Sequence, residues 1–336
     1  MAAIFLRSPR YRDSTCSSTH LSVQMTVTIN SVLAYTIIKD SVAGQKNLFE
    51  FAELARDYVD IVWTGSYSGY SPVTNMVILT DIKYFAGANG SGSEVTSGVS
   101  GGGQITLYGV NGYSNFVDGY NDNIANNETL LSNYTQTTGG VKTYTVYAPK
   151  SIGGTLPYLN STGTQIIYQS YSTSGTSVTL GNNQVVNIER YGCNKYDVVY
   201  IDFVNKWGAI QREYFTLKSV NKINAKRENY QRNIMNNNTG SYSKNQHTIQ
   251  NFNVTGNETL TVNSDYLPEY YNQVYTELLL SEYVWAYIKP FSTNTFTAIP
   301  VNITSSDLVY KTQVNDRLIN FTFSFKMSYD YIQNVR

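Results

Sequence analysis

The chain has 336 residues, a formal net charge of zero and a charged fraction of only 14%, well below the roughly 25% usual in soluble globular proteins. Its length suffices for two domains at roughly 150 residues each. A neutral chain lacks the basic footprint of a nucleic-acid binder, so we expect no sequence-specific nucleic-acid contact, and no membrane partner is indicated. Uncharged polar side chains, including 30 tyrosines, favour extended contact surfaces and association.

No targeting or membrane-spanning segment is predicted. The apolar run at residues 2–6 is too short for a signal-peptide core, and its charges follow it instead of preceding it. No stretch approaches 18 apolar residues, so no transmembrane helix is expected. Cys16 and Cys193 lie far apart and are too few for a disulfide scaffold, so we expect free thiols.

The first 20 residues have no sustained periodicity. They are either a frayed terminus or, because they are too apolar for a solvated tail, an arm that docks onto a neighbouring subunit. Under the second interpretation the candidate interface residues here are Phe5, Leu6, Arg7 and Tyr11.

Residues 21–135 are predicted to form an N-terminal β-sandwich domain. A two-residue apolar period predicts strands at residues 21–30, 32–39, 59–63, 73–85 and 104–108. Residues 47–57 change to a helical period, which predicts a short helix against the sheet. Residues 87–103 form a Gly/Ser-rich loop without a phosphate-binding signature. The oxygen-rich residues 117–128 fit either turn chemistry or a calcium site, although their spacing misses the EF-hand pattern.

Residues 136–336 are predicted to form a C-terminal β domain around a hairpin at residues 196–218. Apolar groups on both faces of its first strand are typical of a strand covered on both sides. Residues 205–208 break the run and predict the loop. Lys206 and Trp207 lie at this tip, where a large ring needs a covering neighbour, so we regard the tip as a docking knob.

The segment after this hairpin is polar and basic. The first part of residues 219–238 is expected to extend the return strand of the hairpin. The rest of the segment, which contains Arg227 and Arg232, is either a solvated loop or a charged contact onto a partner subunit. Residues 249–262 predict a second hairpin that turns at residues 255–257. A capping residue, an early proline and a 3.6-residue period predict an amphipathic helix at residues 268–281.

Further strands are predicted on both sides of that helix. They span residues 141–149, 164–171, 177–180, 184–191, 282–288, 296–304, 307–314 and 317–329. The last of these alternates cleanly between apolar and polar side chains, which gives it one apolar face.

Residues for catalysis or cofactor binding are scarce, and we predict no catalytic, cofactor or metal site. His20 and His247 are the only histidines, and CxxC and HExxH are absent, so the common zinc signals are missing. GxSxG occurs once, at residues 98–102, but inside the Gly/Ser-rich loop and not at the strand-to-helix turn that a serine hydrolase needs. Asp197 and Asp202 are five residues apart on a strand and therefore point to opposite faces. The two-residue period places Asp202 on the face opposite Val199, Ile201 and Phe203, and we expect the hairpin to be structural.

Several segments resemble one group of known proteins. They are FLRSPRY (5–11), FEFAELARDYVDI (49–61), VDGYN (117–121), LLSN (130–133), IDFVNKWGAIQREYF (201–215), FNVTG (252–256), LLLSEYVW (278–285), PVNIT (300–304) and SSDLVYKTQVNDRLINFTFSF (305–325). The chain thereby resembles virion structural proteins of tailed bacteriophages, of the crAss-like and related marine kinds.

That resemblance implies a tail, ring or adaptor protein, with β-sandwich domains repeated around the tail axis. Its expected partners are copies of itself in a ring and other virion tail or portal-proximal proteins. Its expected location is the virion tail, after synthesis in the host cytoplasm. The alternatives are a carbohydrate-binding adhesin or receptor-binding tail module, since aromatic side chains stack on sugars, and a polysaccharide hydrolase.

Overall fold

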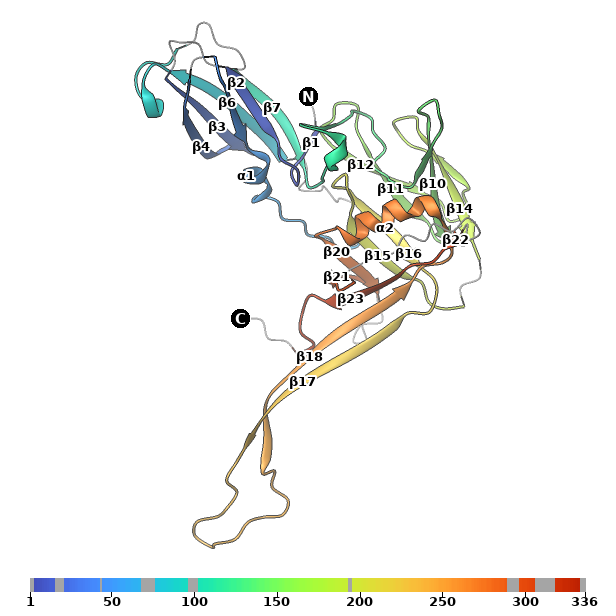
Figure 1. Ribbon diagram of the computed structural model, residues 1–336. Helices are drawn as coiled ribbons and strands as arrows, with labels where there is room; N and C mark the ends of the chain where they lie inside the picture. The colour runs from blue at the N-terminus through green and yellow to red at the C-terminus, as the bar shows by residue number, and fades with distance from the viewer. Residues whose placement is uncertain are drawn as a thin grey trace.

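The computed structural model describes residues 3–15, 21–42, 44–67, 76–95, 102–192, 195–288, 296–305 and 318–332. The fold is mainly β, and the predicted fold class of sandwich-like β domains with one amphipathic helix is confirmed. Figure 1 shows an N-terminal β domain, a larger C-terminal β domain that carries the helix, and a long two-stranded hairpin that projects from the latter. Cys16, Cys193 and His20 and the predicted strand at residues 307–314 lie outside the described residues.

The N-terminal domain is built on a six-stranded sheet of order β4-β3-β6-β7-β1-β8. Its strands are β1 (Ala3–Phe5), β3 (Ser22–Ile29), β4 (Val32–Asp40), β6 (Met76–Phe85), β7 (Gly103–Val110) and β8 (Asn123–Ile124). Burial alternates strictly along β6, because successive side chains of a strand point to opposite faces. The sheet therefore has one core face and one more exposed face.

A smaller layer covers that core face. It consists of the two-stranded sheet of β2 (Tyr11–Thr15) and β5 (Lys46–Glu50), followed by the helix α1 (Ala52–Arg56). Phe49 and Phe51 are buried from this layer against Val23 and Met25 of the sheet. The predicted helix at residues 47–57 is therefore shortened, because its first half pairs with β2 as a strand.

The predicted N-terminal arm is an integral part of this domain. Strand β1 lies between β7, with which it is parallel, and β8, with which it is antiparallel. Phe5 and Leu6 are buried. The prediction of a separate arm is therefore wrong for residues 3–15. A short strand inside a sheet buries apolar side chains on both faces, so these residues need no neighbouring subunit.

The C-terminal domain centres on a seven-stranded sheet of order β16-β15-β20-β21-β23-β18-β17. Its strands are β15 (Val199–Val204), β16 (Ile210–Phe215), β17 (Val220–Gln231), β18 (Ile249–Asn263), β20 (Val284–Ile288), β21 (Thr297–Ile303) and β23 (Thr322–Met327). The predicted hairpin at residues 196–218 is β15 and β16, whose residues are almost all buried.

Two further sheets and a short ribbon complete the domain. They contain β9 (Tyr134–Gln136), β10 (Lys142–Pro149), β11 (Gly154–Leu159), β12 (Ile166–Tyr171), β13 (Ser177–Thr179), β14 (Val185–Tyr191), β19 (Leu267–Pro268) and β22 (Leu318–Ile319). Tyr214 of β16 packs into the core between these sheets, so the layers share one interior. The predicted strand at residues 317–329 is divided between β22 and β23.

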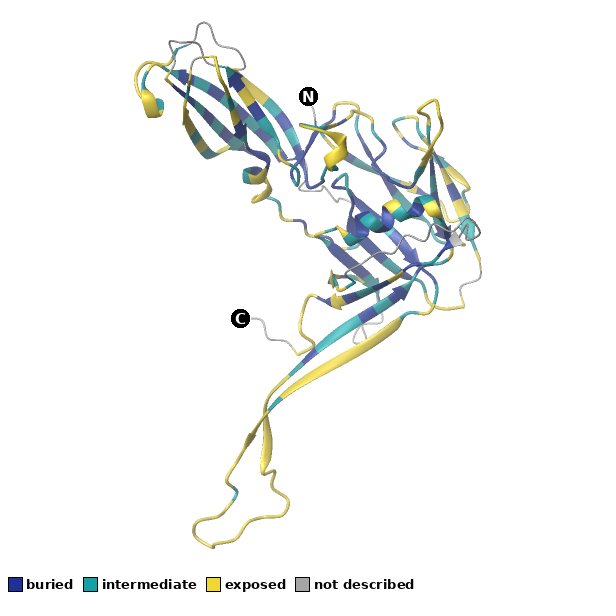
Figure 2. Ribbon diagram, viewed as in Figure 1, coloured by how far each residue is buried: buried dark blue, intermediate teal, exposed yellow. Residues whose placement is uncertain are grey.

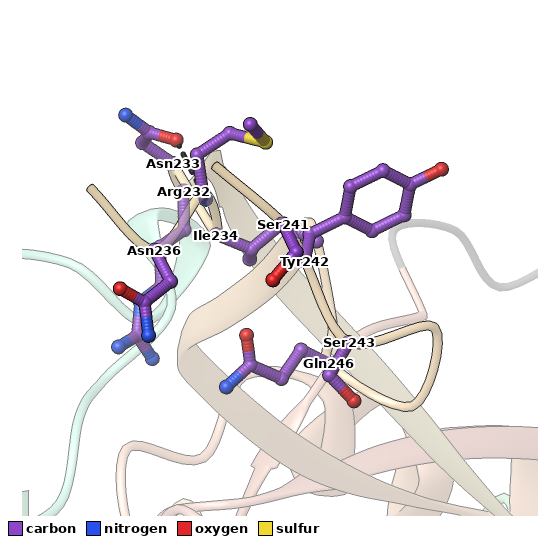
Figure 3. Close-up of a pocket in the computed structure, with 9 residues that line it drawn as sticks. Arg232, Asn233, Ile234, Asn236, Ser241, Tyr242, Ser243 and Gln246 are labelled. Atoms are coloured by element: carbon purple, nitrogen blue, oxygen red, sulfur yellow. Dashed lines mark hydrogen bonds between the residues drawn. The ribbon is translucent and has the colours of Figure 1, made fainter. Parts of the chain in front are cut away.

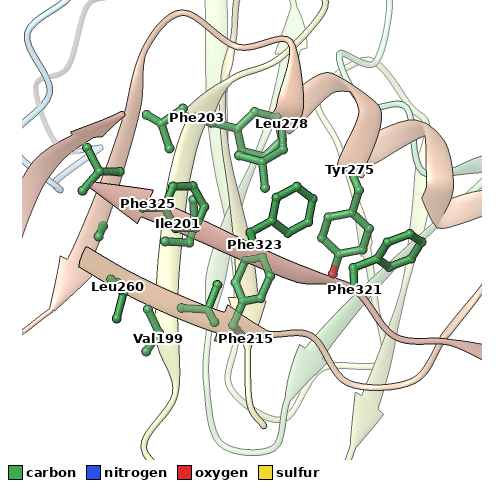
Figure 4. Packing of buried hydrophobic residues seen from close by; sticks show 14 of the residues in the cluster. Val199, Ile201, Phe203, Phe215, Leu260, Tyr275, Leu278, Phe321, Phe323 and Phe325 are labelled. Atoms are coloured by element: carbon green, nitrogen blue, oxygen red, sulfur yellow. The ribbon is translucent and has the colours of Figure 1, made fainter. Parts of the chain in front are cut away.

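The helix α2 (Asn272–Leu279) lies over one face of the seven-stranded sheet (Figure 1). A 3₁₀ turn, Glu269–Tyr271, precedes it, so the helix predicted at residues 268–281 is confirmed with a tighter first turn. Figure 4 shows Tyr275 and Leu278 facing Phe215 and Phe323. Fully burying a side chain of this size contributes about 1.5–3 kcal/mol, so this cluster anchors the domain.

The prediction of a hairpin at residues 249–262 is wrong. β18 continues through residues 255–257 and pairs along its length with β17. Gly256 lies opposite Ala225 in this ladder, and a Cβ added to it would meet the Cβ of Tyr331 at 3.3 Å. A glycine within a strand can mark a place where another part of the chain approaches closely, as well as a turn. Here Gly256 leaves room for the side chain of Tyr331.

The linker between α1 and β6 lies on the C-terminal domain. Its described part has no strand at residues 59–63, where one was predicted. Ile61 and Trp63 are instead buried against Val204, Ile210 and Trp285. The linker thus contributes to the C-terminal domain's packing and ties the two domains together.

Candidate functional site

The predicted docking knob at residues 205–208 contacts the same chain. The Trp207 ring lies 5.9 Å from that of Phe5, and the backbone N–H of Tyr113 donates to the Lys206 carbonyl at 2.8 Å. Lys206 Nζ pairs with Asp118 at 3.2 Å. The large ring is thus covered by the N-terminal domain, which corrects the docking-knob prediction.

The other N-terminal candidates also contact their own chain. Arg7 donates to the Leu280 carbonyl at 2.9 Å and pairs with Glu282 at 3.3 Å. Tyr11 stacks on Tyr120 with ring centroids 5.8 Å apart. Six of the eight candidate interface residues therefore hold the two domains together or pack within them.

Arg227 and Arg232 are the two candidates that remain exposed, and both belong to the projecting hairpin. Arg227 is on β17, and Arg232 begins the tip that joins β17 to β18. In the described part of the chain neither side chain has an ion-pair partner within 4.0 Å. The first part of residues 219–238, which was expected to extend the return strand, forms the separate strand β17.

The hairpin is supported only at its base. β18 pairs with β23 from Thr259 to Asn263, whereas its pairing with β17 extends to Ile249. Among the described strands none pairs with the outer edge of β17. Figure 2 shows the outer half of the hairpin coloured almost entirely as exposed, which agrees with the exposure of its residues in both strands.

Apolar side chains are exposed on this outer half. Tyr230 and Phe252 are 43% and 64% exposed, and their rings meet edge to face at 6.1 Å. The other exposed apolar residues of the hairpin are Val220, Ile223, Met235, Tyr242, Ile249 and Val254. An isolated two-stranded hairpin is at best marginally stable in water, and exposed apolar patches mark interaction sites. The hairpin is therefore our candidate assembly surface.

Sequence reasoning missed these aromatic side chains. A signal was present: Ile249, Phe252 and Val254 are apolar in a segment otherwise rich in amides. The glycine at residue 256 suggested a short hairpin, which hid the continuous strand.

The tip of the hairpin encloses a shallow polar hollow (Figure 3). Arg232, Asn236, Ser243 and Gln246 are among the residues that line it. The ring of Tyr242 projects outward from the tip. Amide, hydroxyl and guanidinium groups beside an exposed ring suit hydrogen bonding to a polar ligand together with stacking.

The buried charges of the C-terminal domain have a structural geometry. Asp202 is completely buried, accepts two hydrogen bonds from Arg212 at 2.6 and 2.7 Å, and accepts one from Trp63 Nε1 at 2.7 Å. As predicted, Asp202 lies on the face opposite Val199, Ile201 and Phe203, and that second face is buried as well. Burial alone would lower the pKa of Arg212, but the hydrogen bonds to Asp202 raise it above its ordinary range, so the guanidinium remains charged.

Two carboxyl groups are buried nearby, and no cation among the described residues forms an ion pair with either of them. Burial raises the pKa of Glu213 to about 8 and also raises the pKa of Glu277. Gln211 donates to Glu213 at 2.8 Å, and the Lys206 backbone N–H donates to Glu277 at 3.1 Å. Neither carboxyl is among the residues that line the hollows on the described surface. Their hydrogen bonds lie inside the domain, which is the geometry of an internal polar network.

Comparisons with known proteins give no relative: no family description, curated protein or solved structure matches the chain. Among the described residues no group of three His, Cys, Asp or Glu is arranged to hold a metal ion. At the calcium candidate, Asp118 accepts from the Asn115 backbone and from Lys206. No helix within the described ranges is long and apolar enough to cross a membrane.

Proposed function

We propose that the protein is a non-enzymatic structural component of a bacteriophage virion, a tail or ring protein that assembles with copies of itself into a cyclic oligomer. The resemblance of its sequence segments to virion proteins supports a role in the virion. The projecting hairpin supports assembly with other copies of the chain. The observation that carries the proposal is a hairpin with exposed aromatic rings and an unpaired outer edge. Such a hairpin gains stability when a neighbour covers it.

The shape of the chain suits head-to-tail contacts. Two different surfaces of one subunit must meet when a ring closes, and here a projecting hairpin and a broad body provide them (Figure 1). An exposed strand edge can also add a strand from a partner, since main-chain hydrogen bonds give affinity in that mode. Other tail or portal-proximal proteins are the proposed neighbours above and below the ring.

The experiment is mass photometry of the purified full chain, followed by electron microscopy of particles that contain it. The expected result is one defined oligomer in solution and density with cyclic symmetry in the particle. A protein that is monomeric both in solution and in the particle would contradict the proposal.

The tip hollow supports a second candidate, a carbohydrate-binding adhesin or receptor-binding tail module. Tyr242 offers a stacking surface, and Asn236 and Gln246 offer hydrogen-bonding groups beside it. A glycan array tests it: saturable binding that Tyr242→Ala abolishes, and that Tyr196→Ala leaves unchanged, would favour the adhesin. Absence of saturable binding would contradict it.

A further inference from the structure

Positive charge is concentrated on the projecting hairpin. Residues 220–263 contain five basic and two acidic side chains, a net charge of +3, and since the whole chain is neutral the remainder carries −3. The basic residues are all exposed: Lys222, Lys226, Arg227, Arg232 and Lys244. Lys226 approaches Glu228 on its own strand, at 3.8 Å.

A complementary surface lies where the helix α1 leads into the linker. Glu53, Asp57 and Asp60 are exposed there, and within the described ranges none of the three has an ion-pair partner within 4.0 Å. Two cations beside this surface, Arg56 and Arg7, are both paired with Glu282. Glu53 and Asp57 line a shallow hollow that Glu282 and Tyr283 close on the other side. We call this surface the acidic junction.

Exposed apolar side chains accompany the charges on both surfaces. Tyr58 and Val62 flank the acidic junction and are exposed, just as Tyr230 and Phe252 accompany the cations on the hairpin. Exposed ion pairs contribute little to affinity, so the charges set orientation while the apolar groups supply buried area. The two surfaces thus match in charge and in polarity.

The hairpin and the acidic junction of one chain lie far apart, at the lower end and the upper part of the molecule in Figure 1. Because the hairpin projects away from α1, it does not reach the acidic junction of its own chain. Any contact between the two surfaces must therefore join two molecules.

We propose that the β17–β18 hairpin of one copy docks against the acidic junction of a second copy. This inference rests on the self-assembly proposed above and names the two surfaces that carry it. The contact joins different surfaces, so repeating it generates the head-to-tail arrangement that a ring requires.

Charge reversal in the full-length chain tests the proposal. The hairpin variant is Lys222→Glu, Lys226→Glu and Arg227→Glu, and the junction variant is Glu53→Lys, Asp57→Lys and Asp60→Lys. The matched control for the hairpin variant makes the same charge change at exposed lysines on other surfaces: Lys46→Glu, Lys150→Glu and Lys195→Glu. Self-association is measured by sedimentation velocity at physiological ionic strength, and circular dichroism verifies folding.

Each reversal alone should weaken self-association about tenfold or more, since several like charges then face each other, whereas the control should assemble like the unmodified chain. An equimolar mixture of the two variants should recover assembly, because each reversed surface meets an opposite charge. Raising the salt concentration should weaken assembly of the unmodified chain.

The failures of the two proposals are distinguishable. An unmodified chain that stays monomeric in solution and in the particle contradicts self-assembly itself. An unmodified chain that assembles while both folded variants assemble equally well overturns only the docking of the hairpin on the acidic junction. Variants that fail separately and also fail when mixed overturn it too.

Discussion

Charged groups are buried in the body of the C-terminal domain, whereas they are exposed on the hairpin that projects from it. In the body, the carboxylate of Asp202 is fully buried and lies 2.6 Å from the guanidinium of Arg212. On the hairpin, Lys226 and Glu228 are 3.8 Å apart and largely in solvent. The same sheet contains both pairs.

That difference separates stability from interaction. A buried pair is costly to break, because removal of one partner leaves an uncompensated charge, whereas an exposed pair contributes little. The body's polar groups therefore fix the fold, and those of the hairpin remain available for a partner. The predictions below test this division, from the largest expected effect to the smallest.

Asp202→Asn should have the largest effect, because it leaves Arg212 buried without its counter-charge. The expected loss is about 3–5 kcal/mol in the free energy of unfolding, measured by urea denaturation. Asp197→Asn, an exposed carboxylate near the start of the same hairpin, is the control and should cost less than about 0.5 kcal/mol. Equal losses in the two variants would contradict the account.

Glu213 should make stability fall as pH rises. Its folded-state pKa of about 8 lies above the ordinary value of 4.5, so the folded state retains a proton that the unfolded chain releases. The contribution of Glu213 to the free energy of unfolding should therefore be fully present below about pH 4.5, decline up to about pH 8, and then level off.

Glu213→Gln should flatten that decline, with a gain of a few kcal/mol at pH 8 relative to the unmodified chain. Thermal melts across this pH range provide the measurement. The control is Glu189→Gln on β14, an exposed position that should leave the slope unchanged. If stability declines as steeply with pH in Glu213→Gln as in the unmodified chain, the claim that Glu213 is buried in its uncharged form is contradicted.

Gly112→Ala tests the junction between the domains. A Cβ at this position would meet the Lys206 carbonyl oxygen at 2.3 Å, so one backbone must move. Overpacking of this kind costs about 1–3 kcal/mol, visible as a lower melting temperature. Gly139→Ala has open space around its Cβ and should melt like the unmodified chain; a similar melting temperature for Gly112→Ala would contradict the close contact.

Phe252→Ala should change stability least, by less than about 0.5 kcal/mol, because its ring is exposed on the hairpin. Phe323→Ala, the same substitution in the core beneath α2, should cost about 3–5 kcal/mol. Chemical denaturation of the two variants compares the regions directly. A large loss for Phe252→Ala in the monomer would show that the hairpin contributes to the fold after all.

Sequence reasoning predicted elements whose signal is local. The helix at residues 268–281 carries its own 3.6-residue period and early proline, although no side chain caps it, and the alternation of Phe323 and Phe325 matches one buried face of β23. Long-range pairing was not predictable in the same way. Whether residues 3–5 form an arm or a strand depends on β7, which is about a hundred residues away in the chain.

The candidate site was predicted only in part. Arg227 and Arg232 were identified because their charges interrupt a polar segment, and they lie on the exposed hairpin. Trp207 and Phe5 were misplaced because an apolar ring at a chain end or a loop tip has the same sequence signature whether its own chain or a neighbour covers it. Burial by the N-terminal domain decides that question, and it requires the tertiary structure.

The most direct test of the central claim is to remove the hairpin's outer half. Residues 227–254 are replaced by Asn-Gly, which favours a two-residue turn, so that Lys226 and Thr255, already paired, close a short hairpin. Sedimentation velocity and a thermal melt are recorded together. We expect a shortened chain that melts like the unmodified monomer and no longer self-associates; a shortened chain that still forms the same oligomer, or whose body unfolds, would contradict the account.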